Sequence, residues 1–317
     1  MKKVLITGGA GFIGSHLADR LLERGDIVAA LDNFNDYYDP DVKRQNIEAA
    51  DSNPNYRMFE ADICDEQRLR EVFSKVQPDV VVHLAARAGV RPSLKDPNLY
   101  HRVNVIGSQH ILDACRDLGP RHLVFASSSS VYGGSKDVPF RESNPVMRPI
   151  SPYAATKRMN ELQAHVYSHI YGLQITMLRF FTVYGPRQRP DMAIHKFTRL
   201  ISERRPVPMF GDGSTRRDYT YIDDILDGLE RCVDRPFDYE IFNLGENHTT
   251  SLRELIDLIA KNVGKPAVIE QEPLQPGDVE ITYADIDHAR DLLGYAPQFS
   301  MNEGIGRFVE WYNRRTP

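Results

Sequence analysis

Short, unbroken apolar runs alternate with amphipathic stretches through the first 180 residues of the chain. The apolar runs predict strands at residues 4–7, 27–31, 57–60, 80–84, 122–126 and 174–179. The stretches between them predict helices at about residues 11–23, 66–76, 104–118 and 153–171. Strands that are apolar throughout are buried on both faces. The pattern therefore predicts an α/β fold, a doubly wound parallel sheet of the Rossmann type.

The regular pattern loosens after about residue 180, where four prolines interrupt it within 25 residues. Two later helices are expected to begin with capping boxes, in which Ser251 and Ser300 are each followed three residues later by a glutamate. We expect a smaller, mixed α/β substrate domain here, with a ligand between it and the first domain. The boundaries we predict are 1–179, with a return near 218–245, for the Rossmann domain, and 180–217 with 246–317 for the substrate domain.

Composition narrows the class of protein only slightly. The chain has 317 residues, is 41% hydrophobic and 26% charged, and carries a net charge of -5, which gives no reason to expect nucleic acid as a partner. Its three cysteines form no Cys-x-x-Cys pattern, which favours a reducing compartment and argues against a disulfide or zinc framework. We find neither a membrane span nor a signal peptide and expect a cytoplasmic protein.

A glycine-rich turn follows the first predicted strand and opens the first helix. In Gly8-Gly9-Ala10-Gly11-Phe12-Ile13-Gly14 the first glycine permits a tight turn. Gly11 allows a pyrophosphate to approach the backbone, and Gly14 allows close packing of helix and strand. The helix N-terminus offers amides and a favourable dipole to phosphates. The motif, including Phe12 and Ile13, is a candidate dinucleotide-binding loop.

Polar groups at the ends of the next strands extend this candidate site. Asp32 ends the second strand and is suited to accept hydrogen bonds from an adenosine ribose. It would repel a 2′-phosphate, and Asn33 adds no positive charge, so NAD is favoured over NADP. Asp62, followed by Ile63, is a further candidate; the alternative is an aspartate that stabilises a turn or caps a helix. The fourth strand leads into Leu84, Ala85 and Ala86.

Tyr153 and Lys157 carry the chemistry. They lie four residues apart, so on a helix they share one face. A tyrosine, with its ordinary pKa near ~10, is a poor base at neutral pH, and a nearby ammonium favours the phenolate. Four serines, Ser127, Ser128, Ser129 and Ser130, follow the strand at 122–126. They form either a polar loop or a set of donors to a reacting oxygen.

Together these motifs resemble the extended short-chain dehydrogenase/reductase family, in its branch of NAD-dependent nucleotide-sugar epimerases and dehydratases. The resemblance covers essentially the whole chain. It implies a bound NAD, a nucleotide diphosphate sugar and hydride transfer at the sugar C4. By matching positions, Tyr153 would be the general base, Lys157 its activator and ribose anchor, and Ser128 the hydrogen-bond partner of the sugar O4. The resemblance also implies a homodimer through the helices around 104–118 and 153–171.

The absence of a carboxylic acid at positions 129 and 130 limits the kind of reaction that the resemblance implies. The 4,6-dehydratases of the family carry an Asp-Glu pair where Ser129 and Ser130 stand, and the sugar-acid decarboxylases carry a glutamate at the second position. Without an acid, a second chemical step lacks its proton carrier. Simple epimerisation through a transient 4-keto intermediate is therefore favoured.

The segment from Thr182 to Ala193 resembles the UDP-glucuronate 4-epimerases, where UDP-galactose epimerases usually carry asparagine at the first of these positions. Arg189 could grip a sugar carboxylate with its planar fork; a surface or diphosphate-binding arginine is the alternative. Arg91 is a second candidate near the sugar. Arg217 matches the diphosphate contact of the family and Asp278 its uridine-ribose contact. Gln275 departs from the arginine that many relatives carry.

The resemblance therefore predicts C4 epimerisation of UDP-glucuronate to UDP-galacturonate. Three alternatives are compatible with the sequence: a UDP-glucose or UDP-N-acetylhexosamine 4-epimerase, a UDP-glucuronate decarboxylase, and a non-catalytic NAD-binding scaffold.

Overall fold

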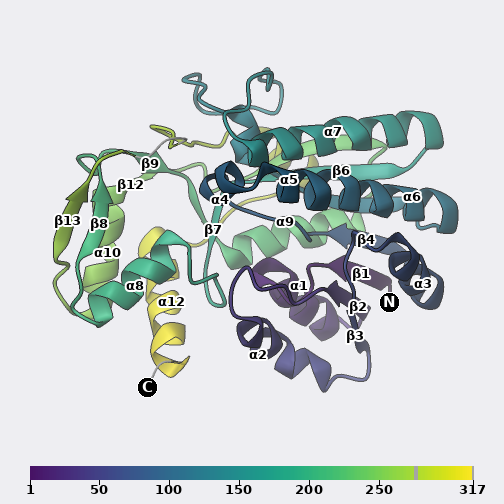
Figure 1. Ribbon diagram of the computed structural model, residues 1–317, viewed down its shortest axis with the longest axis horizontal. Helices are drawn as coiled ribbons and strands as arrows, with labels where there is room; N and C mark the ends of the chain where they lie inside the picture. The colour runs from purple at the N-terminus through teal and green to yellow at the C-terminus, as the bar shows by residue number, and fades with distance from the viewer. Residues whose placement is uncertain (275–277, 316–317) are drawn as a thin grey trace. The chain divides into compact units, whose positions relative to one another are not determined.

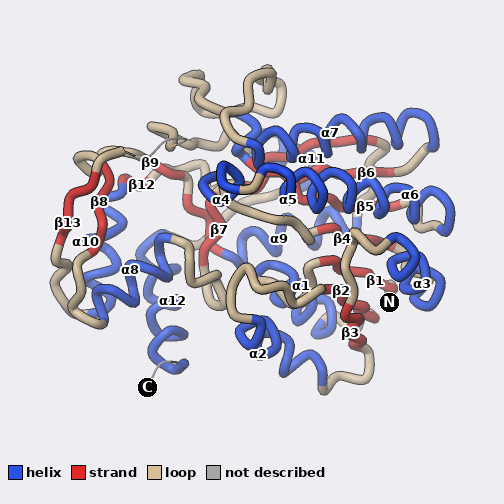
Figure 2. Tube along the Cα trace, in the orientation of Figure 1, coloured by secondary structure: helices blue, strands red, loops and turns tan. Residues whose placement is uncertain are grey.

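A seven-stranded sheet forms the centre of the first part of the chain, with strand order β11-β6-β5-β4-β1-β2-β3. The computed structural model describes residues 1–274 and 278–315. The pairs from β3 through β2, β1 and β4 to β5 are all parallel, and Lys3 pairs with Ile27 and Val4 with Val80. The strands, red in Figure 2, are β1 (Lys3–Thr7), β2 (Ile27–Asp32), β3 (Tyr56–Glu60), β4 (Val80–His83), β5 (His122–Ser128), β6 (Gln174–Phe180) and β11 (Tyr239–Leu244).

Helices connect these strands and cover both faces of the sheet, as in a doubly wound fold. They are α1 (Phe12–Glu23), α2 (Pro40–Asp51), α3 (Glu66–Val76), α4 (Val90–Lys95), α5 (Pro97–Tyr100), α6 (Ser108–Leu118), α7 (Pro152–Tyr171) and α9 (Ile222–Asp234). On one face a core joins α3, α6 and α7 to the side chains of alternate strand residues, such as Leu5, Val81 and Phe125. The predicted fold class is confirmed.

The chain divides into two compact units. Unit 1 contains residues 1–133, 145–179 and 226–242; unit 2 contains residues 134–144, 180–225 and 243–317. Unit 2 has short two-stranded sheets, β7 with β10, β8 with β13 and β9 with β12. Its elements are β7 (Thr182–Tyr184), α8 (Ala193–Ser202), β8 (Val207–Phe210), β9 (Arg216–Arg217), β10 (Tyr219–Tyr221), β12 (Thr250–Ser251), α10 (Leu252–Val263), β13 (Ile269–Glu272), α11 (Asp287–Leu293) and α12 (Met301–Arg315).

Most predicted elements of unit 1 begin and end within two residues of the observed ones, and the helix predicted at 104–118 differs most. It starts as a π-helix, His101–Gly107, and becomes α-helical only at Ser108. Asn104 lies inside the π-helix, where its side chain bonds Arg87 and Thr156 and its carbonyl accepts from Asn160. These bonds tie the π-helix to residues far away in the sequence. The helix α2 was not predicted from the sequence at all.

The predicted capping box of α10 is confirmed: the Ser251 hydroxyl accepts from the Glu254 amide, and the Glu254 carboxylate accepts from the Ser251 amide. In the described parts of the chain, no helix combines the length and the apolar character that crossing a bilayer requires.

Candidate active site

The glycine loop lies between β1 and α1 and is shaped by close backbone contacts. The amides of Gly8 and Gly9 donate to the Leu31 carbonyl, at 2.7 and 3.2 Å. A Cβ on Gly14 would lie 2.3 Å from the Gly8 carbonyl oxygen, and one on Gly8, whose φ is +71°, would lie 2.8 Å from the Ala85 nitrogen. The loop therefore accepts only glycine at these two positions, and it brings the start of α1 close to the 84–86 segment.

His83 joins the end of β4 to its neighbours. Its ring bonds the Thr7 hydroxyl at 2.6 Å and the Ser108 hydroxyl at 3.0 Å, and it stacks edge-on against Phe125. Burial, together with a smaller effect of the Lys157 charge, lowers the pKa of His83 to about 3. The ring is thus neutral and acts as a fixed hydrogen-bonding link between the two strand ends that carry the glycine loop and the 84–86 segment.

The polar residues after β2 and β3 form a connected set. Asp32 is buried, and its Oδ1 accepts from the Phe34 amide at 2.9 Å and from Lys43 Nζ at 3.0 Å. Asn33 donates to Asp62 Oδ2 at 2.9 Å. Both bonds of Asp32 end on one oxygen, so its Oδ2 can accept a ribose hydroxyl. Lys43, on the unpredicted helix α2, partly neutralises the carboxylate on which the preference for NAD was argued.

Asp62 stabilises a turn in addition to meeting Asn33. Its Oδ1 accepts from the Cys64 amide at 2.8 Å. Burial would raise the pKa of Asp62, but the hydrogen bonds from Cys64 and Asn33 outweigh burial and lower it. A carboxylate held ionised in this way remains an acceptor at neutral pH. Ile63 follows it as a buried core residue.

Tyr153 and Lys157 lie in the first two turns of α7. The helix starts at a cap in which the Ser151 hydroxyl accepts from the Ala154 amide, with Pro152 at the first helical position. The Tyr153 ring packs edge-on against Tyr100, with centroids 6.2 Å apart. Lys157 is 4% exposed, and its Nζ donates to the Ala126 carbonyl at 2.8 Å. Burial lowers the pKa of Lys157 to about 8, opposed by the Glu161 carboxylate.

The four serines point in different directions. Ser127 is buried and donates to Glu161 Oε1 at 2.7 Å. Ser128 ends β5, and its Oγ accepts from the Ser130 amide and bonds the Ser130 hydroxyl, both at 3.2 Å. Ser129 and Ser130 are half-buried and begin a short 3₁₀ turn, Ser129–Tyr132. Ser128 and Ser130 are thus paired hydroxyls at the strand end, whereas Ser127 belongs to the interior.

Sequence reasoning missed the partner of Ser127, a buried ion pair. Arg179 donates to both oxygens of Glu161, at 2.8 and 2.9 Å, with 1% and 0% of the two side chains exposed. A signal was present in the sequence, because Glu161 follows Lys157 by one helical turn and Arg179 ends an apolar strand. Neither residue alone indicates the pairing.

The candidate substrate residues lie on more open elements. In unit 2 Thr182 is half-buried at the start of β7, and Arg189 is one-fifth exposed. Arg189 forms a two-bond fork with Asp191, with both N–O distances 3.0 Å. Arg217, in β9, donates to the Arg216 carbonyl at 2.8 Å. In unit 1 Arg91 is exposed on α4; Asp278 of unit 2 is half-buried, and Gln275 lies outside the described residues.

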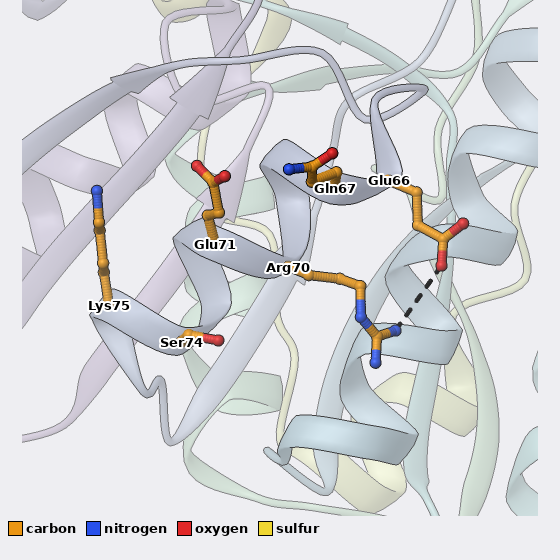
Figure 3. Close-up of a pocket in the computed structure, with 6 residues that line it drawn as sticks. All are labelled: Glu66, Gln67, Arg70, Glu71, Ser74 and Lys75. Carbon is orange, nitrogen blue, oxygen red and sulfur yellow. Dashed lines mark ion pairs between the residues drawn. The ribbon is translucent and has the colours of Figure 1, made fainter.

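A surface hollow along α3 is unrelated to these groups. Figure 3 shows its lining, which comes from this one helix and includes the Arg70–Glu66 ion pair at 3.8 Å. Arg70 also bonds Asp117 of α6 at 3.0 Å. Exposed ion pairs of this kind form an ordinary solvated helix face, so we assign no ligand to the hollow.

Comparison with known proteins places this geometry in context. Residues 5–308 match the family described as GDP-mannose 4,6 dehydratase. The UDP-glucuronate 4-epimerase of Thermodesulfobacterium geofontis is 42% identical over 308 residues, which cover 97% of this chain and 95% of that one.

Two solved structures resemble the whole chain. The UDP-glucuronic acid 4-epimerase of Bacillus cereus, in complex with UDP-glucuronic acid and NAD, is 35% identical with a TM-score of 0.92, over 98% of this chain and 99% of that one. The UDP-glucose 4-epimerase of Thermotoga maritima, with UDP-glucose, is 33% identical with a TM-score of 0.92, over 99% of both chains.

Proposed function

This chain belongs to the GDP-mannose 4,6 dehydratase family of extended short-chain dehydrogenases/reductases, and we propose that it is an NAD-dependent UDP-glucuronate 4-epimerase, an isomerase. The observation that carries the proposal is the serine turn beside the Tyr153–Lys157 helix. Ser128 and Ser130 supply hydroxyls there, and no acid stands at position 129 or 130. The site can therefore oxidise and reduce one carbon but has no carboxylic acid for a dehydration.

The residues of unit 1 fit NAD. The glycine loop, whose Cβ-free positions bring the backbone close, would hold the pyrophosphate at the start of α1. Asp32 Oδ2 would accept a hydrogen bond from a hydroxyl of the adenosine ribose, and Asn33 and Asp62 would lie beside the adenine. Lys157 Nζ, with one of its three donors on Ala126, has donors for the nicotinamide ribose. When bound, NAD+ accepts hydride from the sugar C4 and returns it.

The protein side of the reaction is proton transfer and alignment. The Lys157 ammonium favours the phenolate form of Tyr153, which takes the proton from the sugar O4. Ser128 donates a hydrogen bond to the same oxygen and so aligns it with the base. After the 4-keto sugar has rotated to present its other face, Tyr153 returns the proton to O4. No net redox change occurs, so the cofactor stays bound.

Arg189 is the proposed reader of the sugar C6 carboxylate, because a guanidinium fork matches a carboxylate in two bonds. Its fork with Asp191 shows the same geometry with a protein carboxylate. The 4-keto form of glucuronate is a β-keto acid, which loses CO₂ when the carboxylate bond aligns with the carbonyl π system. Holding the carboxylate near the carbonyl plane, through Arg189 with Thr182 and the serine hydroxyls, would prevent that loss.

One observation favours a second candidate, a UDP-glucose 4-epimerase. Arg189 and Asp191 already form an ion pair, so the guanidinium has a carboxylate partner without a sugar acid. The structural likeness to the Thermotoga maritima UDP-glucose 4-epimerase is as high as that to the Bacillus cereus enzyme.

Product analysis separates these readings. The purified protein is incubated with UDP-glucuronate and, in parallel, with UDP-glucose, and the sugars are identified by chromatography and NMR. We expect UDP-galacturonate from the first and at least 100-fold slower turnover of the second. Turnover of UDP-glucose alone would establish the second candidate. A UDP-pentose as the main product would establish a decarboxylase, and no turnover of either sugar would contradict both epimerase readings.

We also propose domain roles for the two parts of the chain. Residues 1–179, with a return near 218–245, would bind NAD. Residues 180–217 and 246–317 would bind the nucleotide sugar, with Arg217 on the diphosphate and Asp278 on the uridine ribose. Arg91 would assist at the sugar. Three free thiols, at Cys64, Cys115 and Cys232, support a cytoplasmic setting.

A homodimer is proposed from the outer face of α7. Leu162, Val166 and Ile170 follow one another at helical spacing there and are 52%, 47% and 62% exposed. A row of apolar side chains at i, i+4 and i+8 favours a partner helix. The neighbouring α6 lies beside α7 (Figure 1), joined to it by the Gln163–Gln109 bond at 2.8 Å. Light scattering should give twice the chain mass, and Val166→Glu should halve it.

A further inference from the structure

The buried Glu161–Arg179 pair is a charged cluster of unit 1 that the proposed chemistry does not use. Besides Arg179, Glu161 accepts from Ser127 at 2.7 Å and from Arg158 at 2.9 Å. Burial would raise the pKa of Glu161, but Arg179 and these other donors outweigh burial and lower it. A carboxylate held ionised and fully buried must keep its charged partner, because losing Arg179 would leave an uncompensated charge in the interior.

The pair holds the serine turn at two points. Ser127, immediately before Ser128, donates to Glu161 Oε1. Tyr132, at the end of the turn, accepts from Arg179 Nη1 at 2.9 Å, and the guanidinium lies over its ring at 4.9 Å. The residues between these two points, 128–131, include the catalytic hydroxyl. Glu161 is on α7, the helix that carries Tyr153 and Lys157, so the same pair links the turn to the base.

We propose that Glu161 and Arg179 are positioning residues: they fix the Ser128 hydroxyl relative to Tyr153 and maintain the positive charge of Lys157. The proposal rests on the proposed function, because Ser128, Tyr153 and Lys157 take their roles from it. The hydrogen bonds support the claim about Ser128, since a turn held at both ends to one side-chain pair has little freedom to move. Helical spacing supports the claim about Lys157, since Glu161 follows Lys157 by one turn.

Several groups face Lys157. Glu161 is the carboxylate on its own helix, and Tyr153 precedes it by one turn. From β4 comes His83, which is neutral, and from β5 comes the Ala126 carbonyl. Glu161 is therefore the counter-charge that opposes the effect of burial on the Lys157 pKa. Without it, Lys157 loses its proton at a lower pH, and the phenolate of Tyr153 loses its stabilising charge.

Three variants test the proposal in the NAD-loaded enzyme. Ser127→Ala and Tyr132→Phe each remove one hydroxyl of the two-point attachment and leave the ion pair in place. We expect kcat to fall about 10-fold in each, while KM for UDP-glucuronate and the amount of bound NAD stay within about 3-fold. If Ser127 instead contacts the sugar directly, its variant raises KM.

Glu161→Gln combined with Arg179→Met removes the pair without leaving a buried charge alone. For this double variant we expect a larger loss of kcat and an alkaline limb of the kcat–pH profile that moves to lower pH. The matched control is Arg20→Met with Glu230→Gln, another two-bond ion pair of unit 1, which joins α1 to α9 with N–O distances of 3.1 and 3.0 Å. The control should lower the melting temperature without moving the pH profile.

A second measurement does not depend on turnover. The ultraviolet absorbance of the Tyr153 phenolate is titrated as the difference from Tyr153→Phe, with and without the double substitution. We expect the phenolate to appear at higher pH when Glu161 and Arg179 are replaced. This result distinguishes failure of the inference from failure of the proposed function. A purely structural pair would leave the titration, the pH profile and kcat as in the control, and that outcome overturns the proposal.

Discussion

The candidate catalytic and positioning groups of unit 1 and the candidate substrate groups of unit 2 are held differently. Lys157, Glu161 and Arg179 are at least 96% buried, sit within regular helices and strands, and bond partners far away in the sequence. Arg189 bonds a carboxylate two residues away, and Arg217 bonds the carbonyl of the residue before it and, at 3.5 Å, the Glu280 carbonyl. The first set is buried in the core, whereas the second lies on a loop and a two-residue strand and is partly exposed.

This difference matches the two tasks of an epimerase. A base, its activator and a hydroxyl must stay aligned to a fraction of an ångström, which buried side chains with several bonds achieve. Groups that recognise a sugar must exchange one partner for another as the sugar arrives and turns, which partly exposed side chains on loops and short elements allow. We expect substitutions in the first set to change kcat and substitutions in the second to change KM and the choice of sugar.

The largest expected effect is that of Tyr153→Phe. Removal of the base should lower kcat at least 1,000-fold, in the range found for general bases (about 10²–10⁴). Because the ring still packs against Tyr100, the fold and bound NAD should be retained. Steady-state kinetics and the absorbance of bound nucleotide measure both. Tyr171→Phe, at the end of the same helix, is the control; retained epimerisation in Tyr153→Phe would remove this residue from the role of base.

Lys157→Met should separate activity from stability. We expect kcat to fall about 100-fold, since the phenolate loses its partner. The burial that lowers the Lys157 pKa from 10.5 to about 8 costs stability at neutral pH. Between pH 8 and 10.5 the unfolded chain holds a proton that the folded chain lacks, so the stability of the wild type rises with pH across this window.

Methionine removes that cost, on the order of 3 kcal/mol at pH 7 for the NAD-free protein. The gain should shrink from pH 8 upward and vanish near pH 10.5. Urea unfolding of both proteins at pH 7, 8.5 and 10 measures it, and a gain that does not depend on pH would contradict the buried-charge explanation.

Arg189→Gln tests the candidate substrate groups of unit 2. Losing a two-bond contact to a carboxylate should raise KM for UDP-glucuronate about 10- to 100-fold, as expected for hydrogen bonds to charged groups. Turnover of UDP-glucose should change less than 3-fold, and some UDP-pentose should form. The control is Arg205→Gln, which breaks the exposed Arg205–Glu203 bond of 3.1 Å in the same unit. Equal effects on both sugars would remove Arg189 from carboxylate recognition.

The smallest expected effect is that of Asp191→Asn. Asp191 offers Arg189 a carboxylate with which the sugar acid must compete. Neutralising it should lower KM for UDP-glucuronate about 3-fold and leave UDP-glucose unaffected, which competition assays with both sugars can detect. A rise in KM would instead mean that Asp191 orients Arg189 for the sugar.

Much of unit 1 could be predicted because its signals are local. The strand and helix positions follow from apolar periodicity, and the glycine loop follows from its spacing after a strand. The π-helix could not be predicted, because Asn104 inside it bonds Arg87, Thr156 and Asn160, which are distant in sequence. Lys43 was missed with α2, whose polar sequence gave no clear period.

The candidate site shows the same division. Tyr153 and Lys157 were found by helical spacing, and Ser128 was singled out among the four serines by the family resemblance. These roles stay predictions until the variants are measured. The direction of the Ser127 hydroxyl could not be read from four equivalent serines. Its partner is fixed by Arg179, 52 residues further along the chain, and only the folded sheet brings the two together.

The length of α7 has a consequence of its own. Each residue added to an α-helix turns everything after it by about 100°. Along α7, Lys157 and Glu161 face the interior, while Leu162, Val166 and Ile170 face outward in a second row one residue out of phase. A single insertion after Lys157 would turn Glu161 away from Arg179 and the outer row into the core. Descendants of this chain can therefore exchange residues along the helix far more freely than they can gain or lose one.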